Sequence, residues 1–428
     1  MGLDPSREAL EAIVRDEAGL VLASLIASFG DFDLAEDALQ DAVAAALESW
    51  PRDGVPQRPA AWLTVAARRR ALDRLRHAAM RADKAEALRA SEELRRSESA
   101  TTEAGDDVTD ERLRLLFTCC HPALSSEARV ALTLRTLGGL SSEAVARAFL
   151  LPVATLAKRL ERAKHKIRDA RIPYRVPPQS DWVQRLGSVL AVVYLIFNEG
   201  YSATGAEPAA RYSLCEEAIR LARMLTALLP RDGEAHALLA LMLLHHARRE
   251  ARFADDGAFV PLDEQDRGRW RRDELREGLE ALRIAASRER GAYQVQAAIA
   301  AAHALAPSGA DTPWHTIAAL YAELELLAPS PVVRVNRIVA VGRAHGPEAG
   351  LALLAALEDD DAARLLADYQ PYYAARADLL RSAGRTEEAA AAYRIAIDLC
   401  RGEPERRFLA GRLAGLAPHG LDSLARGR

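Results

Sequence analysis

The chain has 428 residues, of which half are hydrophobic and 5% aromatic, and its net charge is −4 with a pI near 6.3. This length exceeds what one hydrophobic core accommodates and predicts about two to four domains. The mildly acidic balance excludes a generic cationic coat for nucleic acid, so the local distribution of charge is more informative than its sum. Four cysteines in so long a chain do not form a disulfide framework, which favours a reducing, cytoplasmic location.

The pattern of residues predicts a nearly all-α protein. Alanine is abundant, Gly and Pro fall mostly between periodic segments, and runs of alternating Val, Ile and Thr are absent. We expect no secretory signal peptide and no membrane span, because the most apolar stretch, residues 187–197, has only the length of a buried helix.

A first helical unit is predicted over residues 1–80. Its helix over residues 30–50 has Asp33 as the expected N-cap. Four apolar residues of this helix can face inward: Leu34, Ala38, Val43 and Leu47. Four polar residues form an outer patch: Glu36, Asp37, Gln40 and Asp41. A solvated acidic face near a helix N-terminus, where acids interact favourably with the helix dipole, accounts for the same pattern without any partner.

A basic helix over residues 60–77 follows a predicted loop over residues 51–59 that contains prolines. Its second half is crowded with five arginines: Arg68, Arg69, Arg70, Arg74 and Arg76. Cations near a helix C-terminus are electrostatically favoured, which explains part of this bias. Five arginines within nine residues exceed what one helix end requires.

Residues 81–109 are predicted to be a flexible linker, since they are rich in charged and polar residues and poor in apolar ones. Helices are expected over residues 110–117 and 126–137. Between them, Cys119, Cys120 and His121 are adjacent and would point in different directions on a helix, so a buried structural role is expected rather than a metal site.

Residues 141–168 predict a short helix, a turn ending at Pro152 and a longer basic helix. One stripe of the second helix is apolar at steps of three and four: Val153, Leu156, Leu160, Ala163 and Ile167. The other face carries Thr155, Lys158, Arg159, Arg162 and Lys166. Such a pair is a candidate helix-turn-helix, whose second helix would enter the DNA major groove. An ordinary amphipathic pair with a solvated basic face remains the alternative when this window is considered alone.

Three motifs in order resemble the extracytoplasmic-function sigma factors of bacterial RNA polymerase. They are AEDALQDAV (35–43), AWLTVAARRRALDRLR (61–76) and LLPVATLAKRLERAKHKIR (150–168). The resemblance implies sigma region 2 over residues 1–80, a linker over 81–109 and sigma region 4 over 110–172. The chain departs from the family pattern at Arg69, where asparagine is common, and at Leu150, where glycine is common.

The resemblance also implies a role for each set of polar residues. Core polymerase would be bound by Glu36, Asp37, Gln40 and Asp41. The promoter −10 element would be bound by Arg58, Trp62, Arg68, Arg69, Arg70, Asp73, Arg74 and Arg76. The −35 element would be bound by Thr155, Lys158, Arg159, Arg162, Lys164, Lys166 and Arg168.

Beyond a Pro-rich linker at residues 173–182, residues 183–428 are predicted to form a domain of helical hairpins. The unit over residues 372–400 resembles a tetratricopeptide repeat, with Ala377, Ala389, Tyr393 and Ala396 at its packing positions. Looser hairpins are expected at residues 209–247, 273–305 and 314–342. The segments 117–125, 193–205 and 252–270 resemble the sigma-factor subgroup with a C-terminal tetratricopeptide-like extension, in which the extension replaces or supplements an anti-sigma factor. For segments 193–205 and 252–270, the plain alternative to this interpretation is that each is a loop packed on its own domain.

We find no Walker loop, dinucleotide fingerprint or zinc spacing in the sequence, so we expect no enzyme, no cofactor and no metal. The implied partners are the polymerase core, through its β′ clamp and β flap, and promoter DNA, with contact between the extension and the sigma domains. No membrane partner is expected, and the protein would be cytoplasmic and nucleoid-associated when active. The alternative function is a polymerase-independent helix-turn-helix regulator with a tetratricopeptide sensor domain.

Overall fold

The computed structural model describes residues 18–81, 108–138, 140–149, 151–202, 208–358, 366–400 and 402–416. The described residues are helical and contain no strand, only one isolated β-bridge between Phe253 and Phe259, so the predicted all-α class is confirmed. The predicted linker lies almost wholly outside the described residues. In the described parts, no helix has the length and hydropathy needed to span a bilayer.

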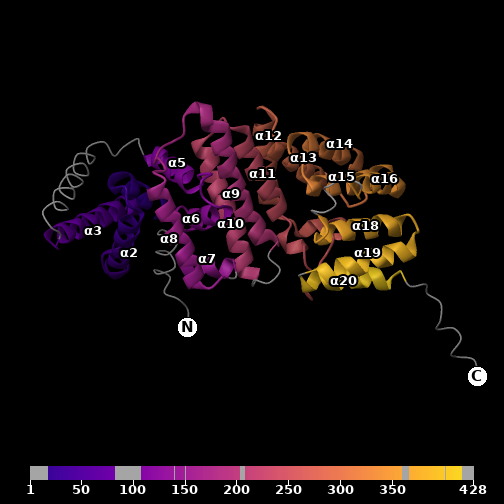
Figure 1. The fold of residues 1–428 in the computed structure, drawn as a ribbon, viewed down its shortest axis with the longest axis horizontal. Helices are drawn as coiled ribbons and strands as arrows, with labels where there is room; N and C mark the ends of the chain where they lie inside the picture. Colours follow the sequence, from indigo (N-terminus) through magenta and orange to yellow (C-terminus); the bar gives the residue numbers. More distant parts are fainter. Residues whose placement is uncertain are drawn as a thin grey trace, which may run out of the picture. The chain divides into compact units, whose positions relative to one another are not determined.

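Two compact units make up the chain (Figure 1). The first contains the described residues up to Tyr201 together with helix α10 (Pro208–Leu228). The second contains the described residues from Leu229 onward. The sequence predicted five segments (1–80, 81–109, 110–172, 173–182 and 183–428), and this finer division remains a prediction.

Helices α2 (Phe32–Asp53) and α3 (Pro59–Arg81) pack against one another in the first unit and follow helical residues 18–29. The N-cap of α2 is Asp31 and not the predicted Asp33, because the Asp31 carboxylate accepts hydrogen bonds from the backbone N–H groups of Asp33 and Leu34 at 2.8 and 3.1 Å. Gly30, with φ of 68°, makes the turn that places Asp31 there.

The buried face of α2 differs from the expected one. It consists of small residues and two aromatics: Phe32, Ala35, Ala38, Ala42, Ala46 and Trp50. Of the predicted inward residues only Ala38 is buried, and Leu47 is 39% exposed. An alanine face allows the backbones of α2 and α3 to approach closely, so close packing prevails over side-chain hydrophobicity here.

The predicted loop over residues 51–59 is also shorter than expected. Helix α2 continues through Pro51 to Asp53, and Gly54 ends it with its N–H bonded to the Trp50 carbonyl at 2.9 Å. Proline removes one N–H from the helical ladder, and here the carbonyl that loses its partner belongs to Leu47, a residue that is 39% exposed, near the end of the helix.

The helix-turn-helix is confirmed. Helices α5 (Val108–Cys119) and α6 (Ser126–Thr136) are followed by α7 (Ser142–Ala148) and α8 (Val153–Asp169), and both α6 and α7 pack on α8. The buried stripe of α8 is Leu156, Leu160, Ala163 and Ile167, as predicted. Val153, at the first position, is 43% exposed because the stripe meets its neighbours only from the second turn on. Leu150 lies outside the described residues.

Helix α9 (Trp182–Ser202), preceded by a 3-10 turn (η2, Gln179–Asp181), and helix α10 share the first unit with the helix-turn-helix. The Trp182 ring lies 5.3 Å from that of Phe117, and the Arg185 guanidinium donates to the Phe117 carbonyl at 2.7 Å. Helix α10 packs on α5 and α7. The sequence assigned both helices to the C-terminal domain, but they contact the predicted DNA-binding unit directly.

The second unit is a succession of helices in which neighbours along the chain pack together. They are α11 (Gly233–His246), α12 (Arg272–Ala286), α13 (Ala292–Leu305), α14 (Trp314–Leu327), α15 (Pro331–His345), α16 (Pro347–Glu358), α18 (Gln370–Ser382), α19 (Thr386–Leu399) and α20 (Glu403–Ala414). In the α18–α19 hairpin, Ala377, Ala389, Tyr393 and Ala396 are buried, as the repeat pattern predicts, and Gly384 turns the chain with φ of 76°.

The insert over residues 252–270 contains three-residue 3-10 turns (η4, Leu262–Glu264; η5, Arg267–Arg269) after a similar turn, η3 (Arg249–Ala251). The Arg267 guanidinium donates to the carbonyls of His303 and Ala306, each at 2.6 Å. Two carboxylates of the insert form ion pairs with Arg343 on α15 and Arg412 on α20, at 2.5 and 2.8 Å. The insert therefore packs on its own unit, which favours the plain alternative for this segment.

Candidate nucleic-acid interface

The outer face of α8 presents the cations that the sequence assigned to the −35 element. The side chains of Thr155, Lys158, Arg162, Lys166 and Arg168 are exposed, while the apolar stripe behind them is buried against α6 and α7. The Arg162 Nε donates to the Lys158 carbonyl at 3.2 Å, so its guanidinium stays close to the helix and keeps donors for a partner. This face can contact phosphates and base edges.

Arg159 lies apart from this exposed set. It is half-buried and lines a cavity of about 230 Å³ between the helix-turn-helix and α9, together with Glu127 and Glu199. The pKa of Glu127 is lowered by its own backbone N–H and the Ser125 hydroxyl, with a smaller contribution from Arg159. The structure thus separates Arg159 from Arg162, which the helical pattern had placed on one face.

Lys164 is turned toward α2 instead of outward. Its ammonium group lies 2.8 Å from both the Asp33 and Glu36 carboxylates, and the Arg168 guanidinium lies 3.5 Å from Asp33. The Lys164 and Glu36 side chains are 11% and 13% exposed. Burial alone would lower the pKa of Lys164, but the two carboxylates outweigh it, and the pKa is raised. Lys164, a predicted DNA contact, and Glu36, a predicted polymerase contact, therefore form an ion pair with each other.

A second contact joins the segment that follows α8 to the helix over residues 18–29. The Tyr174 hydroxyl donates to the Ala23 carbonyl at 2.9 Å and has the Glu111 carbonyl as a further acceptor at 3.2 Å. A Cβ on Gly19 would lie 2.8 Å from the Leu137 carbonyl oxygen, so the helix over residues 18–29 packs closely on the end of α6. Sequence reasoning missed Tyr174, and its only signal was an aromatic residue among prolines.

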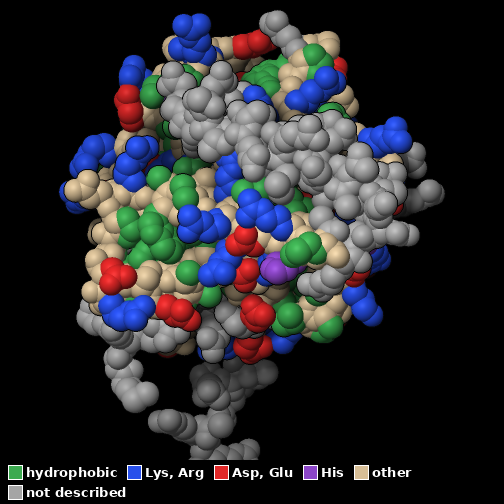
Figure 2. Space-filling model, turned by 90° about the vertical axis from the view of Figure 1, so that its left-hand side faces the viewer, with side chains coloured by type: hydrophobic (Ala, Val, Ile, Leu, Met, Phe, Trp, Pro, Cys, Tyr) green, Lys and Arg blue, Asp and Glu red, His purple; other side chains and the backbone are tan. Residues whose placement is uncertain are grey.

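The acidic face of α2 is partly neutralised by α3. The Arg74 guanidinium lies 2.5 Å from Asp37 and 2.7 Å from Asp41, and hydrogen bonding to Asp41 in particular raises the pKa of Arg74. Gln40 is exposed. Figure 2, which views the molecule from the side where Figure 1 shows α2 and α3, shows Lys and Arg side chains beside Asp and Glu side chains on the described part of this face.

The face of α3 assigned to the −10 element is mixed. Arg58, Arg69 and Arg70 are exposed, and Trp62 is half-buried with its ring 5.4 Å from that of Trp50. Arg76 pairs with Asp73 at 3.1 Å. Burial lowers the pKa of Arg68, and its Nη2 is buried without a hydrogen-bond partner.

Sequence reasoning also missed Val65, which is 66% exposed on α3. It lies three residues after Trp62 and four before Arg69, so the three side chains share one helical face. An aromatic, an exposed aliphatic and a cation side by side suit contact with unstacked bases. The signal was the i, i+3, i+7 spacing, which looks the same when such a face is buried.

Comparison with known proteins gives a consistent assignment along the chain. Residues 13–81 match the model of sigma-70 region 2, and residues 114–167 match that of sigma-70 region 4. Residues 185–286 match a family of unknown function, DUF6596. An uncharacterized protein of Rhizobium meliloti (strain 1021) is 42% identical over 398 residues, which cover 92% of this chain and 93% of the relative.

Proposed function

Because the chain belongs to the sigma-70 family, as an extracytoplasmic-function sigma factor with a C-terminal helical extension, we propose that it directs core RNA polymerase to promoters with defined −10 and −35 elements. Sigma factors of this family are DNA-binding initiation factors, and we assign no catalytic residue. Its action would take place in the cytoplasm, at the nucleoid when it is bound to polymerase.

The observation that carries this proposal is the exposed basic face of α8 over a fully buried stripe, in the same chain as α2 and α3. Lys158 and Arg162 would read the −35 duplex, and Lys166 and Arg168 would contact phosphates. Trp62, Val65 and Arg69 would hold the separated −10 strand by stacking and charge.

The ion pairs between α2 and α8 support a closed form of the free protein, in which the two sigma regions contact each other. The Glu36–Lys164 ion pair would have to break before Glu36 could bind the β′ clamp and Lys164 could bind the −35 phosphates. Asp37 and Asp41 would likewise leave Arg74 to dock on the clamp, whereas Gln40 is already exposed. Binding to polymerase would therefore be coupled to separation of the two sigma regions.

The extension would set activity through region 4, including its reach to the β flap. Arg220 of α10 donates to the Leu137 carbonyl at 2.8 Å, at the end of α6, and Arg185 of α9 donates to the end of α5. These contacts would fix the orientation of the helix-turn-helix, so a change in the extension would be transmitted to promoter recognition.

In vitro transcription tests the proposal directly. Purified protein added to core polymerase, with no other sigma subunit, should produce transcripts from a subset of the organism's promoters. The free protein should bind the same promoter duplex poorly. A tight footprint by the protein alone, together with no transcripts with core enzyme, would instead establish a polymerase-independent regulator.

A further inference from the structure

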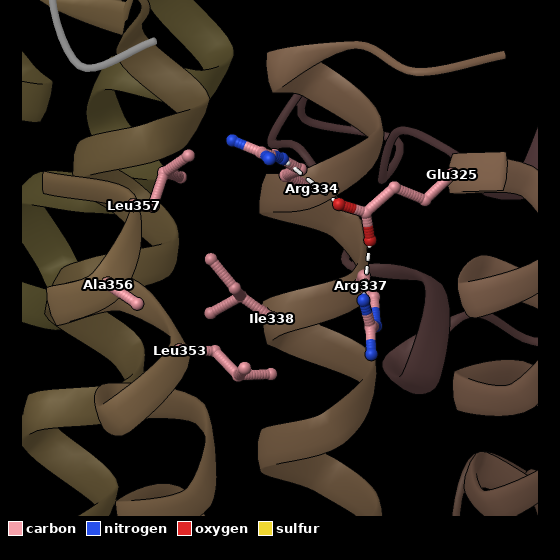
Figure 3. A pocket seen from close by; sticks show the side chains of 7 residues that line it. All are labelled: Glu325, Arg334, Arg337, Ile338, Leu353, Ala356 and Leu357. Carbon is pink, nitrogen blue, oxygen red and sulfur yellow. Dashed lines mark hydrogen bonds and ion pairs between the residues drawn. The ribbon is translucent and has the colours of Figure 1, made fainter. Parts of the chain in front are cut away.

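A cavity of about 190 Å³ lies among helices α14, α15 and α16 in the second unit (Figure 3). One wall is aliphatic and comes from α15 and α16: Ile338, Leu353, Ala356 and Leu357. The other wall carries the charged side chains of Glu325, Arg334 and Arg337. No step of promoter recognition uses this cavity, so its combination of apolar and charged walls calls for an account of its own.

Arg337 lines the cavity and has donors that Glu325 does not use. Its Nη1 lies 2.5 Å from the Glu325 carboxylate, while its Nε is buried and has no hydrogen-bond partner. Arg334 bonds the other oxygen of Glu325 through its Nε at 3.0 Å and has a further interaction elsewhere, so no ligand role is assigned to it. The Nε is closed to solvent, whereas the side chain as a whole is 36% exposed, so the Nη2 amino group is the donor that an occupant can reach.

The cavity adjoins a hollow whose rim is partly apolar. This hollow of about 620 Å³ shares the same three charged residues and is bordered by Pro329, Pro331 and Leu326, whose side chain is 85% exposed. A fully hydrated anion gains nothing from such a rim or from the aliphatic wall, whereas an anion with an apolar tail gains from both.

We propose that this cavity binds a small aliphatic carboxylate, with the carboxylate on Arg337 and the tail against Ile338 and Leu357. A carboxylate accepts a charge-assisted hydrogen bond from a guanidinium, which is stronger than a bond between neutral groups. An apolar cavity of about 150 Å³ holds benzene, so this one accepts roughly six to eight non-hydrogen atoms. The extension would then carry a ligand site of its own, independent of whether the chain acts as a sigma factor.

Calorimetric titration of the full-length protein with butanoate, hexanoate, octanoate and hexanamide tests the proposal. Hexanoate should bind saturably and hexanamide, which has the same shape without the charge, at least ~10-fold more weakly. Equal binding of the acid and the amide would refute recognition by Arg337. The proposal would also be refuted if no carboxylate reached saturation at about 10 mM, a concentration above the dissociation constants of specific complexes.

Two variants locate the site. Arg337→Met keeps much of the side-chain volume but removes the donors, and Ala356→Leu fills the cavity; both should reduce hexanoate affinity at least ~10-fold. Arg283→Met, which removes an exposed arginine on α12 that pairs with Glu280, should leave the hexanoate affinity unchanged. Unaltered hexanoate binding by a folded Ala356→Leu variant would place the ligand elsewhere. N-acetylated dipeptides ending in leucine, titrated in parallel, show whether the natural carboxylate belongs to a peptide or a free acid.

Discussion

Lys164 connects two surfaces to which we assign separate roles in the proposed promoter recognition. Its helix α8 presents cations to solvent at neighbouring positions, yet its own ammonium group is held by Asp33 and Glu36. The partners are separated by 128 residues or more in the chain, and no periodicity encodes such a pairing. The sequence thus predicted Lys164 and Glu36 as site residues but could not show that they bind each other.

Replacing Lys164 by methionine should destabilise the first unit. The substitution leaves Glu36 buried without its cation, and one oxygen of Glu36 already has no hydrogen-bond partner. Removing one member of a buried ion pair costs about 3 kcal/mol, although the exposed Asp33 reduces the loss somewhat. Urea unfolding measures it, with the exposed Lys158→Met as the control that should change stability by less than about 0.5 kcal/mol. Equal stability of the two variants would contradict a buried pair.

His303 should make the second unit sensitive to mild acid. Burial and then the charges of Arg248 and Arg267 lower the pKa of His303 from 6.5 to about 4. Below pH 6.5 the unfolded chain gains a proton that the folded chain does not accept, so stability is full above pH 6.5 and falls as the pH approaches 4. The loss from this residue is about 3 kcal/mol at most.

The variant His303→Gln should have a flatter pH dependence between pH 6.5 and 4 than the unaltered protein. Hydrogen exchange of peptides from α13, followed across this range, measures the free energy of opening. Parallel curves for the two proteins would assign the acid sensitivity to other groups, such as the half-buried His245, whose pKa is also lowered, chiefly by desolvation.

Helix existence and helix faces were predictable to different degrees. The turn at Pro152 and the buried stripe of α8 follow from local periodicity, because large aliphatic residues mark one face clearly. On α2 the same approach chose Leu34 and Leu47, whereas alanines are buried. An alanine-rich helix carries little hydrophobic contrast, so its inner face depends on how closely the partner helix approaches.

The exposed face of α8 gives a prediction about DNA. Arg162→Ala should weaken binding of polymerase to promoters by about 1–3 kcal/mol if the guanidinium reads bases, with relaxed discrimination at one position. A role at phosphate alone would give the same loss for every sequence and a salt slope smaller by about 1. Arg159→Ala should have a smaller effect, because Arg159 is half-buried beside Glu127. Competition assays on promoter variants at several salt concentrations measure both, and no effect of Arg162→Ala would remove this face from the mechanism.

Across the chain as a whole, the match to DUF6596 and the first compact unit overlap. Helix α10 and all but the first three residues of α9 lie within the matched residues 185–286, yet both helices belong to the unit that contains the helix-turn-helix. The side chains that cover region 4 include Trp182 and Arg185. Sequence reasoning placed the boundary at the prolines of residues 173–182, where local composition changes, because the docking of a later helix on an earlier one leaves no local mark.

Truncation should reveal this organisation. A chain ending after Leu228 keeps the first unit whole and should remain folded and monomeric, whereas a chain ending after Asp181 exposes Phe117 and Leu116, which are buried in the full protein. An exposed apolar patch of this kind favours aggregation. Size-exclusion chromatography and circular dichroism compare the two. Equal solubility and helicity would contradict a shared core.

The four cysteines have a practical consequence for experiments on this protein. All are buried, and burial raises the pKa of the Cys120 thiol to about 11, so at neutral pH its reactive thiolate is scarce. A maleimide dye offered to the native protein should therefore find little to modify. Single cysteines engineered at exposed positions, such as Val65 on α3 and Thr155 on α8, would accept a pair of fluorophores on the otherwise unaltered chain. Energy transfer between them would then report, in real time, whether α3 and α8 separate when polymerase binds.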